Sequence, residues 1–288
     1  MEVFATYGHY ADHLAPVAAL LPPDLDVALV AGWNDVVRAK RHKRIVRLEH
    51  GAGQSYGSDH PAYPGGRGHE GVGLFLTPNE HSADRWRRAY PLASVAPVGC
   101  PKLDTLPTRS PLRPYPVVAI TFHFDLHLVP ETVSALAFYR DALPALAEEF
   151  TVIGTGHPRR TDLARVYAKA GIEYVPDFAE VCRRADVLAF DNTSAGFEFA
   201  ATGRPVVLMD SPNYRRDVSH GLRFWDAAHI GTSVGVPTDL VPAIYRALEN
   251  RPEDVAARED ALETVYAYRY GAAQRAADTI VEWAESHA

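Results

Sequence analysis

Short apolar runs alternate with longer amphipathic stretches along the chain, and this rhythm restricts its fold more than any other feature. In the first part of the chain, runs rich in β-forming residues each precede a helical pattern: 3–5 before 12–21, 27–30 before 35–41, and 74–76 before 80–89. A strand, a helix and a further strand make up the repeating unit of a parallel sheet covered by helices. The sequence therefore predicts an α/β protein.

A proline-rich stretch, "PTRSPLRPYP" at residues 107–116, interrupts this alternation and is the predicted linker. After it the pattern restarts with strands at 117–120, 151–153, 187–190 and 205–209, the last closing the series, and with helices at about 131–148, 162–170 and 195–202. We expect two doubly wound Rossmann-type domains, residues 1–107 and 108–288, which face a central cleft where a ligand binds. The tail 254–288 is helical throughout by pattern and is expected to pack back on the first domain.

Composition favours a cytoplasmic globular protein. Of the 288 residues 47% are apolar, which suffices for a sizeable core, but the longest apolar runs, such as 116–122, are far shorter than the roughly 20 residues that span a bilayer. Met1 leads into a predicted strand and not into a charged and apolar stretch, so we expect no signal segment there. Cys100 and Cys182 lie far apart and form no CxxC pair. The sequence predicts no metal site and no cofactor, and peripheral contact with the inner membrane face stays open.

Charge is distributed unevenly. The net charge of −7 opposes nonspecific binding of nucleic acid, yet basic residues crowd the window 38–47. We expect Arg41 and Lys43 in this window to attract an anionic acceptor. The alternative is that the basic residues of this window form only a solvent-exposed helix face and bind nothing.

Two histidines follow predicted strands. His50 stands before Gly51 in "RLEHGAGQSYGS", at the end of a strand of the first domain, and His157 in "TGHPRR" stands just past the strand 151–153 of the second. An imidazole, with an ordinary pKa near 6.5, is suited to exchange a proton at neutral pH. Small neighbours such as Gly51 let a substrate approach the backbone. Each histidine taken alone is more often a structural residue, and it is the pair that favours a functional role.

Two further segments carry polar or turn-forming residues to strand ends. The segment "FDNTSAGFE", 190–198, leads from a strand into a helix and predicts an anion site, with phosphate as the expected guest, at Asp191, Asn192, Thr193 and Ser194. The same residues could be only a helix cap and its turn. The segment "VGCPKLDTL", 98–106, ends the last strand of the first domain, and we expect it to line the cleft through Gly99, Pro101 and Lys102, together with Gly51.

These segments together resemble a known family. "EHGAG", "VGCPKLDTL", "GTGHPRR" and "FAEVCRRADVLAFDNTSAGFEFAATGRPVVLMD", in this order, are similar to the CDP-glycerol glycerophosphotransferases, the teichoic-acid primases and polymerases of the GT-B superfamily. The resemblance runs over residues 45–235. The chain departs from the family in having Asn192 for an aromatic residue, Thr193 for the first serine of a pair, and "QSY" at 54–56 where a lysine is usual.

The resemblance implies a GT-B fold and a transfer of glycerol phosphate from CDP-glycerol to a hydroxyl, with release of CMP. In this reading His50 is the base, and His157, Thr193 and Ser194 stabilise the charge that grows on the phosphates. Asp191 would orient the turn, and Glu198 would reach a ribose or glycerol hydroxyl.

Other classes of protein stay open. A GT-B glycosyltransferase or a non-hydrolysing sugar-nucleotide epimerase would use a UDP-sugar with similar residues, and a binding module would use the site without catalysis. The expected partner is a nucleotide-activated donor. A polyol-phosphate chain, a lipid-linked sugar, a capsule glycan or modified DNA would each suit as acceptor.

Overall fold

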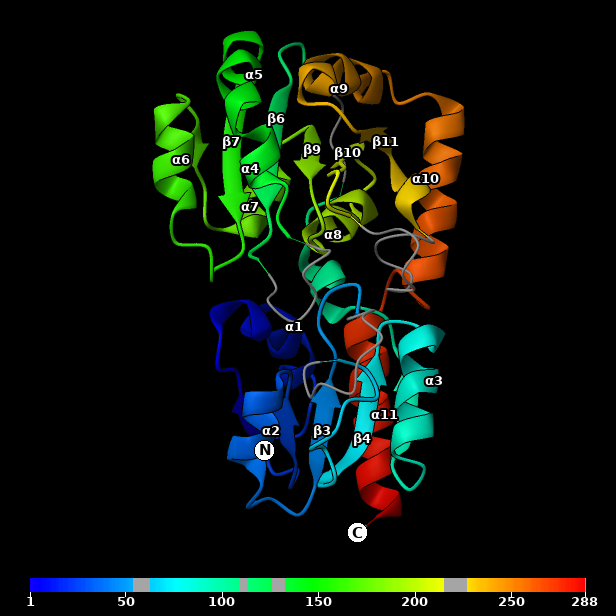
Figure 1. Ribbon diagram of the computed structural model, residues 1–288. Helices are drawn as coiled ribbons and strands as arrows, with labels where there is room; N and C mark the ends of the chain where they lie inside the picture. The colour runs from blue at the N-terminus through cyan, green and yellow to red at the C-terminus, as the bar shows by residue number, and fades with distance from the viewer. Residues whose placement is uncertain (54–62, 109–112, 126–132, 215–226, 288) are drawn as a thin grey trace. The chain divides into compact units, whose positions relative to one another are not determined.

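The computed structural model describes residues 1–53, 63–108, 113–125, 133–214 and 227–287 (Figure 1). Among these residues, contacts divide the chain into two compact units. Unit 1 comprises residues 1–105 and 263–287, and unit 2 comprises 106–214 and 227–262. The sequence-based division placed its boundary after residue 107 and counted the whole C-terminal tail with the second domain, whereas the residues from 263 onward here group with unit 1.

Unit 1 is built on a parallel sheet. Its strands follow one another in space in their order along the chain: β1 (Glu2–Phe4), β2 (Ala28–Val30), β3 (Ile45–Leu48), β4 (Val72–Thr77) and β5 (Ser94–Pro97). Because all five run in the same direction, their carboxyl ends meet at one edge of the sheet. His50 follows β3 at that edge.

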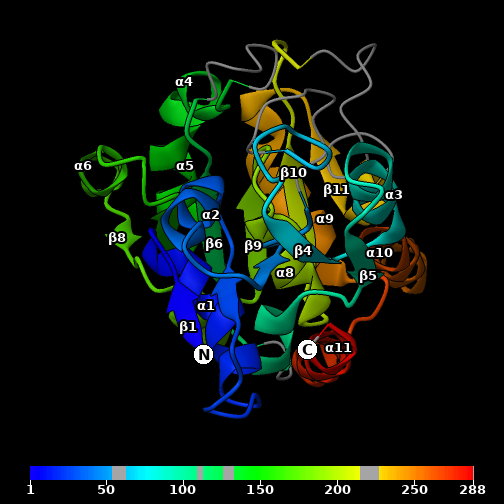
Figure 2. The same cartoon turned by 90° about the horizontal axis from the view of Figure 1, so that it is seen from below.

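Helices cover both faces of this sheet (Figure 2). α1 (Gly8–Ala18) and α11 (Ala272–Ser286) pack on one face, where Val46 and Ile280 share a core. α2 (Trp33–Ala39) and α3 (Glu80–Ala89) pack on the other, where Ile45 and Trp86 share a second core. Successive strand residues point to opposite faces, so the neighbours Ile45 and Val46 serve different cores.

Unit 2 contains a second parallel sheet, and its strand order reverses in the middle. The order is β11-β10-β9-β6-β7-β8, formed by β6 (Val117–Phe122), β7 (Thr151–Gly156), β8 (Glu173–Tyr174), β9 (Val187–Phe190), β10 (Val206–Met209) and β11 (Thr232–Val234). The chain builds outward from β6 in one direction and then returns to place β9 on its other side. The carboxyl ends of β6 and β9 therefore flank a topological switch point, where open α/β sheets bind their ligands.

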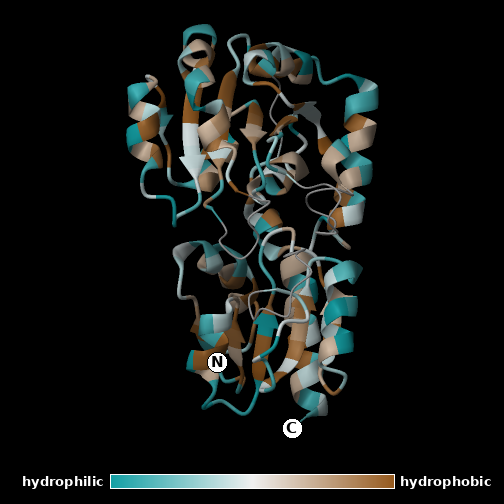
Figure 3. Cartoon of the chain, viewed as in Figure 1, coloured by the Kyte–Doolittle hydropathy of each residue, from teal (hydrophilic) through white to brown (hydrophobic). Residues whose placement is uncertain are grey.

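Helices also cover both faces of the second sheet. One core joins the strands to α4 (Leu136–Tyr139), α5 (Leu143–Glu149), α6 (Leu163–Lys169) and α9 (Leu240–Glu249). On the opposite face, Phe190 of β9 packs against Phe197 of α8 (Ala195–Ala201) at 6.0 Å between ring centroids. A further helix, α7 (Phe178–Arg184), precedes β9 and buries Val181. Figure 3 shows the apolar residues concentrated in the strands.

Two expectations about the second half were wrong. The strand at 205–209 does not close the series, because β11 pairs with β10 beyond it. The tail is not helical throughout: α10 (Pro252–Val265) and α11 are separate helices, and Gly271 between them adopts a left-handed backbone with φ 69°. Only glycine takes this conformation without strain, so the chain turns there.

The predicted helix at 131–148 is also interrupted. Residues 126–132 lie outside the described part of the chain, and the rest forms α4, a 3-10 turn at Arg140–Ala142, and α5. A proline, Pro144, stands at the first turn of α5. Because proline lacks the N–H that would continue a preceding helix, it favours a new start at this point.

Candidate functional site

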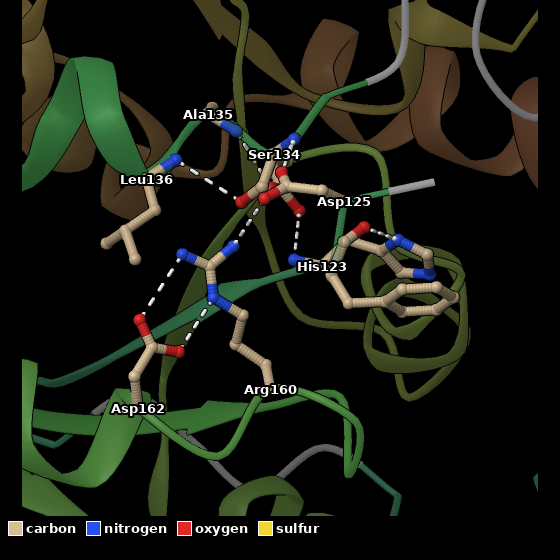
Figure 4. Close-up of polar contacts among 9 residues, drawn as sticks. His123, Asp125, Ser134, Ala135, Leu136, Arg160 and Asp162 are labelled. Atoms are coloured by element: carbon tan, nitrogen blue, oxygen red, sulfur yellow. Dashed lines mark hydrogen bonds and ion pairs between the residues drawn. The ribbon is translucent and has the colours of Figure 1, made fainter. Parts of the chain in front are cut away.

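The switch point of unit 2 brings together residues from two separate loops. His123 directly follows β6, and Asp191 directly follows β9. The backbone N–H of His123 donates to Oδ1 of Asp191 at 2.9 Å, so the two strand ends are tied together (Figure 4). Asp191 also accepts from Ser134 Oγ at 3.1 Å and from the Ala135 N–H at 3.2 Å.

Asp191 is fully buried. Burial raises its pKa to about 6, although the hydrogen bonds from His123, Ala135 and Ser134 act in the opposite direction. The sequence predicts that Asp191 orients the turn that follows it and binds donor phosphate. Its carboxylate instead holds the loop after β6, because its donors come from that loop and its burial keeps it from a ligand.

A second set of polar contacts joins the loops after β6 and β7. Asp125 accepts from the Ser134 N–H at 3.0 Å and pairs with Nη1 of Arg160 at 3.5 Å (Figure 4). Arg160 Nε in turn donates to Asp162 at 2.8 Å, and this hydrogen bond lowers the pKa of Asp162. The loop that carries His157 is thereby connected to the loop that carries His123.

His157 and His123 lie next to each other. Their ring centroids are 5.1 Å apart, and the rings are inclined at 63°. Phe124 contacts both, at 4.4 Å from His123 and 4.5 Å from His157. Because β6 and β7 are adjacent strands, two imidazoles meet at the carboxyl edge.

The turn at 192–194 is less open than expected. Asn192 and Thr193 expose only 2% and 8% of their surfaces, whereas Ser194 is partly exposed. Thr193 Oγ1 accepts from the Ala195 N–H at 3.3 Å, which leaves its hydroxyl hydrogen able to donate. Glu198 exposes 3% and is buried within α8, although the sequence analysis expected it to face a ribose or glycerol hydroxyl.

In unit 1, His50 lies in a cluster of rings. It is partly exposed, and its ring centroid is 4.8 Å from Tyr10, 5.8 Å from His9 and 6.0 Å from His13. A side chain at Gly32 would collide with the Tyr10 ring, so Tyr10 packs between that backbone and His50. The aromatic neighbour therefore restricts the orientation of the imidazole.

His13 is the buried member of this cluster. Its Nδ1 lies 3.5 Å from Cys100 Sγ, and it exposes 2% of its surface. Burial, followed by the positive charge of Lys102, holds the pKa of His13 well below its ordinary value. The ring is therefore neutral at physiological pH.

The segment 98–106 holds the C-terminal helix. A side chain at Gly99, where φ is 89°, would collide with the carbonyl of Tyr268. Asp104 accepts from the N–H groups of Gly271 at 2.8 Å and Ala273 at 2.7 Å, at the start of α11. Pro101 and Lys102 are buried in the 3-10 helix Pro101–Thr105, and Gly51, with φ 63°, forms the turn after His50. Gly99 was expected to line a cleft, and it allows α11 to dock instead.

Arg41 and Lys43 do not lie beside His50. They precede β3, at the amino edge of the sheet, while His50 follows β3 at the carboxyl edge. Arg41 is exposed and pairs with Glu2 at 2.8 Å. Whether these residues attract an anionic acceptor stays a prediction. The structure places them at the edge of the sheet opposite His50, because the basic window runs into β3 and the length of that strand separates the two edges.

The site residues predicted from the sequence do not include His123, Ser134, Arg160 or the ring cluster around His50. The signal for His123 was present, because it lies three positions after the strand run at 117–120, much as His157 lies four positions after 151–153. No local pattern pointed to Ser134 or Arg160. Whether these two residues reach the site depends on which strands are neighbours in the sheet.

Within the described ranges, His, Cys, Asp and Glu side chains form no group of three that could hold a metal ion. None of the helices described has the length and apolar character needed to cross a membrane. The residues "QSY" at 54–56 lie outside the described part of the chain.

No protein-family model matches the sequence, and no curated protein matches it. Solved structures do. A variant of the wall teichoic acid polymerase TagF with CDPG aligns with a TM-score of 0.63 and 13% identity over 91% of this chain and 73% of that one. The UDP-GlcNAc 2-epimerase from Neisseria meningitidis aligns with a TM-score of 0.57 and 17% identity, over 89% and 75%. The putative epimerase from Listeria monocytogenes aligns with a TM-score of 0.56 and 13% identity, over 100% and 82%. The chain therefore has an α/β fold of the GT-B type.

Proposed function

We propose that the chain is a transferase that moves a glycerol-phosphate or other polyol-phosphate group from a CDP-activated donor to a hydroxyl acceptor and releases CMP. The observation that carries this proposal is the switch point of unit 2. Three adjacent parallel strands, β9, β6 and β7, end there in the turn 192–194, His123 and His157. Hydroxyls and imidazoles at a switch point suit the phosphates of a nucleotide. The fold shared with TagF, solved with CDPG, supports the same reading.

In the proposed reaction the acceptor oxygen forms a bond to the phosphorus that carries the glycerol. The bond from that phosphorus to the CMP oxygen breaks, and its electron pair stays on CMP. His50 takes the proton of the acceptor hydroxyl. Charge grows on the departing phosphate, where the ring N–H of His157 and the hydroxyls of Thr193 and Ser194 donate hydrogen bonds.

A UDP-sugar is the second candidate donor. The structural likeness to UDP-GlcNAc 2-epimerase favours it, as do Asn192 and Thr193, which replace residues of the CDP-glycerol family pattern. In that case the same strand ends would bind the diphosphate, and the reaction would occur at the sugar carbon. The acceptor, and any contact with a membrane, stay open in both cases.

Nucleotide binding tests the proposal. We would measure the thermal unfolding of the protein with CDP-glycerol, CDP, CMP, UDP and UDP-GlcNAc. A ligand at a hundred times its Kd adds about 2.7 kcal/mol to the free energy of unfolding. CDP-glycerol is expected to stabilise most, and a preference for UDP-GlcNAc would favour the second candidate. If no nucleotide stabilises the protein, both proposals are wrong.

A paired variant connects binding to the turn. Replacing Thr193 and Ser194 together by alanine should weaken nucleotide binding, because two hydroxyl donors are lost. Thr238→Ala is a matched control, since Thr238 is exposed in the same unit and precedes α9. Equal nucleotide affinity in the double variant and the control would remove the turn from the site.

A further inference from the structure

Asp35 is a fully buried carboxylate of unit 1 that the proposed reaction does not use. It lies in the first turn of α2, after β2. Its Oδ2 accepts from the backbone N–H of Gly32 at 3.0 Å. Its Oδ1 accepts from the backbone N–H of Thr6 at 2.8 Å and from the Thr6 hydroxyl. Because Thr6 follows β1, this carboxylate joins the loops after two adjacent strands.

The backbone of Gly32, which Asp35 holds, is the surface on which Tyr10 packs. Gly32 is the N-cap of α2, a position where Ser, Asp or Asn would bond the start of the helix. A Cβ atom there would lie 2.6 Å from Cε2 of Tyr10 and 3.2 Å from Oδ2 of Asp35. A residue with a side chain would therefore displace the Tyr10 ring, whereas glycine leaves room for it.

Tyr10 in turn contacts the candidate base. Its ring centroid lies 4.8 Å from that of His50, and the two rings are inclined at 54°. The contacts thus begin at Thr6 after β1 and at Asp35 after β2, and they end at His50 after β3. These three strands are neighbours in the sheet, so the contacts run along its carboxyl edge.

A base must present its nitrogen lone pair to the acceptor hydroxyl, and a misplacement of about 1 Å can lower the rate by about 10². We propose that Asp35 is a positioning residue for the His50 imidazole. It acts by fixing the backbone on which Tyr10 packs, and its burial keeps it from the substrate. This inference rests on the proposed function and deepens it, because it assigns the geometry of proton transfer to a residue remote from the reacting atoms.

Two substitutions disturb these contacts at different points. In Asp35→Asn, one carboxylate oxygen becomes an NH2 group, which cannot accept, so either the Gly32 N–H or the donors of Thr6 lose their partner. In Gly32→Ala, the added Cβ displaces the Tyr10 ring directly. If Asp35→Asn does not fold, Thr6→Val replaces it, since it removes only the hydroxyl donor to the carboxylate.

Gly73→Ala is the matched control for stability. There the added Cβ would meet Cζ2 of Trp283 at 2.5 Å, a collision of the same kind in the same unit. Gly73 lies near the amino end of β4, whereas His50 follows the carboxyl end of β3. This variant should lower the midpoint of urea unfolding without disturbing the imidazole.

NMR of protein with isotope-labelled histidine reports on His50 without a substrate. The His50 signal is identified by its loss in His50→Gln, and the nearby ring of Tyr10 shifts it by ring current. Tyr10→Leu removes that shift, and Tyr10→Phe keeps it. We expect Asp35→Asn and Gly32→Ala to move the signal toward its position in Tyr10→Leu. Gly73→Ala should leave it unchanged.

Kinetics test whether the position of the ring affects catalysis. We would follow the release of CMP from CDP-glycerol, with glycerol as the hydroxyl probe. Asp35→Asn should lower kcat by about 10- to 100-fold and change the donor KM by less than about twofold. Because Asp35 acts through Tyr10, the double variant Asp35→Asn/Tyr10→Leu should have the kcat of Tyr10→Leu alone. Gly73→Ala should keep the kcat of the wild type.

The outcomes separate this inference from the proposed function. An unmoved His50 signal in Asp35→Asn overturns the inference, and so does an unchanged kcat. A loss of kcat that adds to that of Tyr10→Leu, or that Gly73→Ala shows equally, makes Asp35 a residue of general stability. If the wild type binds no nucleotide or releases no CMP, the proposed function fails, and the NMR comparison still decides whether Asp35 positions His50.

Discussion

Asp191 combines complete burial with three accepted hydrogen bonds, and burial makes its ionised form energetically unfavourable. A pKa raised from 3.8 to about 6 means that the folded protein binds a proton there more tightly than the unfolded chain does. Asp191 therefore contributes stability that is fully present below pH 3.8 and is lost as pH rises through about 6. The total is about 3 kcal/mol, since one pKa unit corresponds to about 1.4 kcal/mol.

We expect this loss to appear when the free energy of unfolding of the wild type is compared with that of Asp191→Asn, whose amide cannot titrate. Urea unfolding at a series of pH values from 4 to 8 would measure it. The free energy of unfolding of the wild type should fall relative to that of the variant between about pH 4 and pH 6 and level off above about pH 7. Parallel curves over that range would show that Asp191 does not titrate there.

His50 is the second residue whose role can be tested directly. If it takes the proton, His50→Gln should lower kcat by a factor of about 10² to 10⁴ with little change in donor affinity, because glutamine cannot act as a base. The acidic limb of the pH–rate profile, expected at about pH 6 to 7, should disappear with it. His42→Gln is the control, since His42 lies at the amino edge of the same sheet and pairs with Glu2 at 3.1 Å.

A near-normal kcat in His50→Gln, with the acidic limb unmoved, would make His50 a packing residue of the ring cluster. Both roles of His50, as a base and as a packing residue, have a physical basis in the structure. Tyr10 packs against the imidazole, which is what a packed residue requires, and it also restricts the ring to one orientation, which is what a base requires.

Among the elements, helix α11 depends on a side chain that lies far from it in the sequence but next to it in space. Asp104 accepts from two N–H groups in the first turn of this helix, where the backbone has no partners of its own. Asp104→Ala should lower the free energy of unfolding by about 1 kcal/mol, as the loss of a helix cap does, and Asp104→Asn by less, because one acceptor oxygen remains.

Urea unfolding gives the change in stability, and amide hydrogen exchange locates it. Exchange in the Asp104→Ala variant should increase first at the start of α11, residues 272–275. An increase spread evenly over unit 1, or confined to other elements, would contradict a capping role.

At the scale of the whole molecule, the C-terminal residues complete unit 1. Ala276, Ile280 and Trp283 of α11 belong to the core that also contains Val46 and Leu74. A side chain at Gly73 would collide with Trp283, so this helix packs directly on β4. Without α11, the part of this sheet face that α11 covers, including β4, would be exposed to water.

A chain that ends at residue 265 should therefore lose the fold of unit 1 and keep that of unit 2. Limited proteolysis followed by mass spectrometry would identify the protected fragment, expected to lie within residues 106–262. Protection of residues 1–105 in the truncated chain would contradict the dependence.

The α/β fold and most of its strands could be predicted from the periodicity of the apolar residues. Apolar runs such as 117–120 and 187–190 became β6 and β9, because a strand buried on both faces must be apolar on both. Following each strand to its carboxyl end located His50, His157 and the turn at 191–194, and the same rule would have found His123. The left-handed turn at Gly271 and the strand β11 were missed, since one glycine or three residues give little periodicity.

Which strand ends are neighbours could not be predicted, because it depends on long-range packing. The order β9-β6-β7 places Asp191, His123 and His157 side by side, although the chain separates the first from the last by more than thirty positions. It also turned Asp191 away from its own turn and toward the loop after β6, and it placed Arg41 at the edge opposite His50. Local sequence fixes where a strand ends, because periodicity and turn chemistry act over a few residues. Strand order comes from long-range packing, which no short pattern encodes.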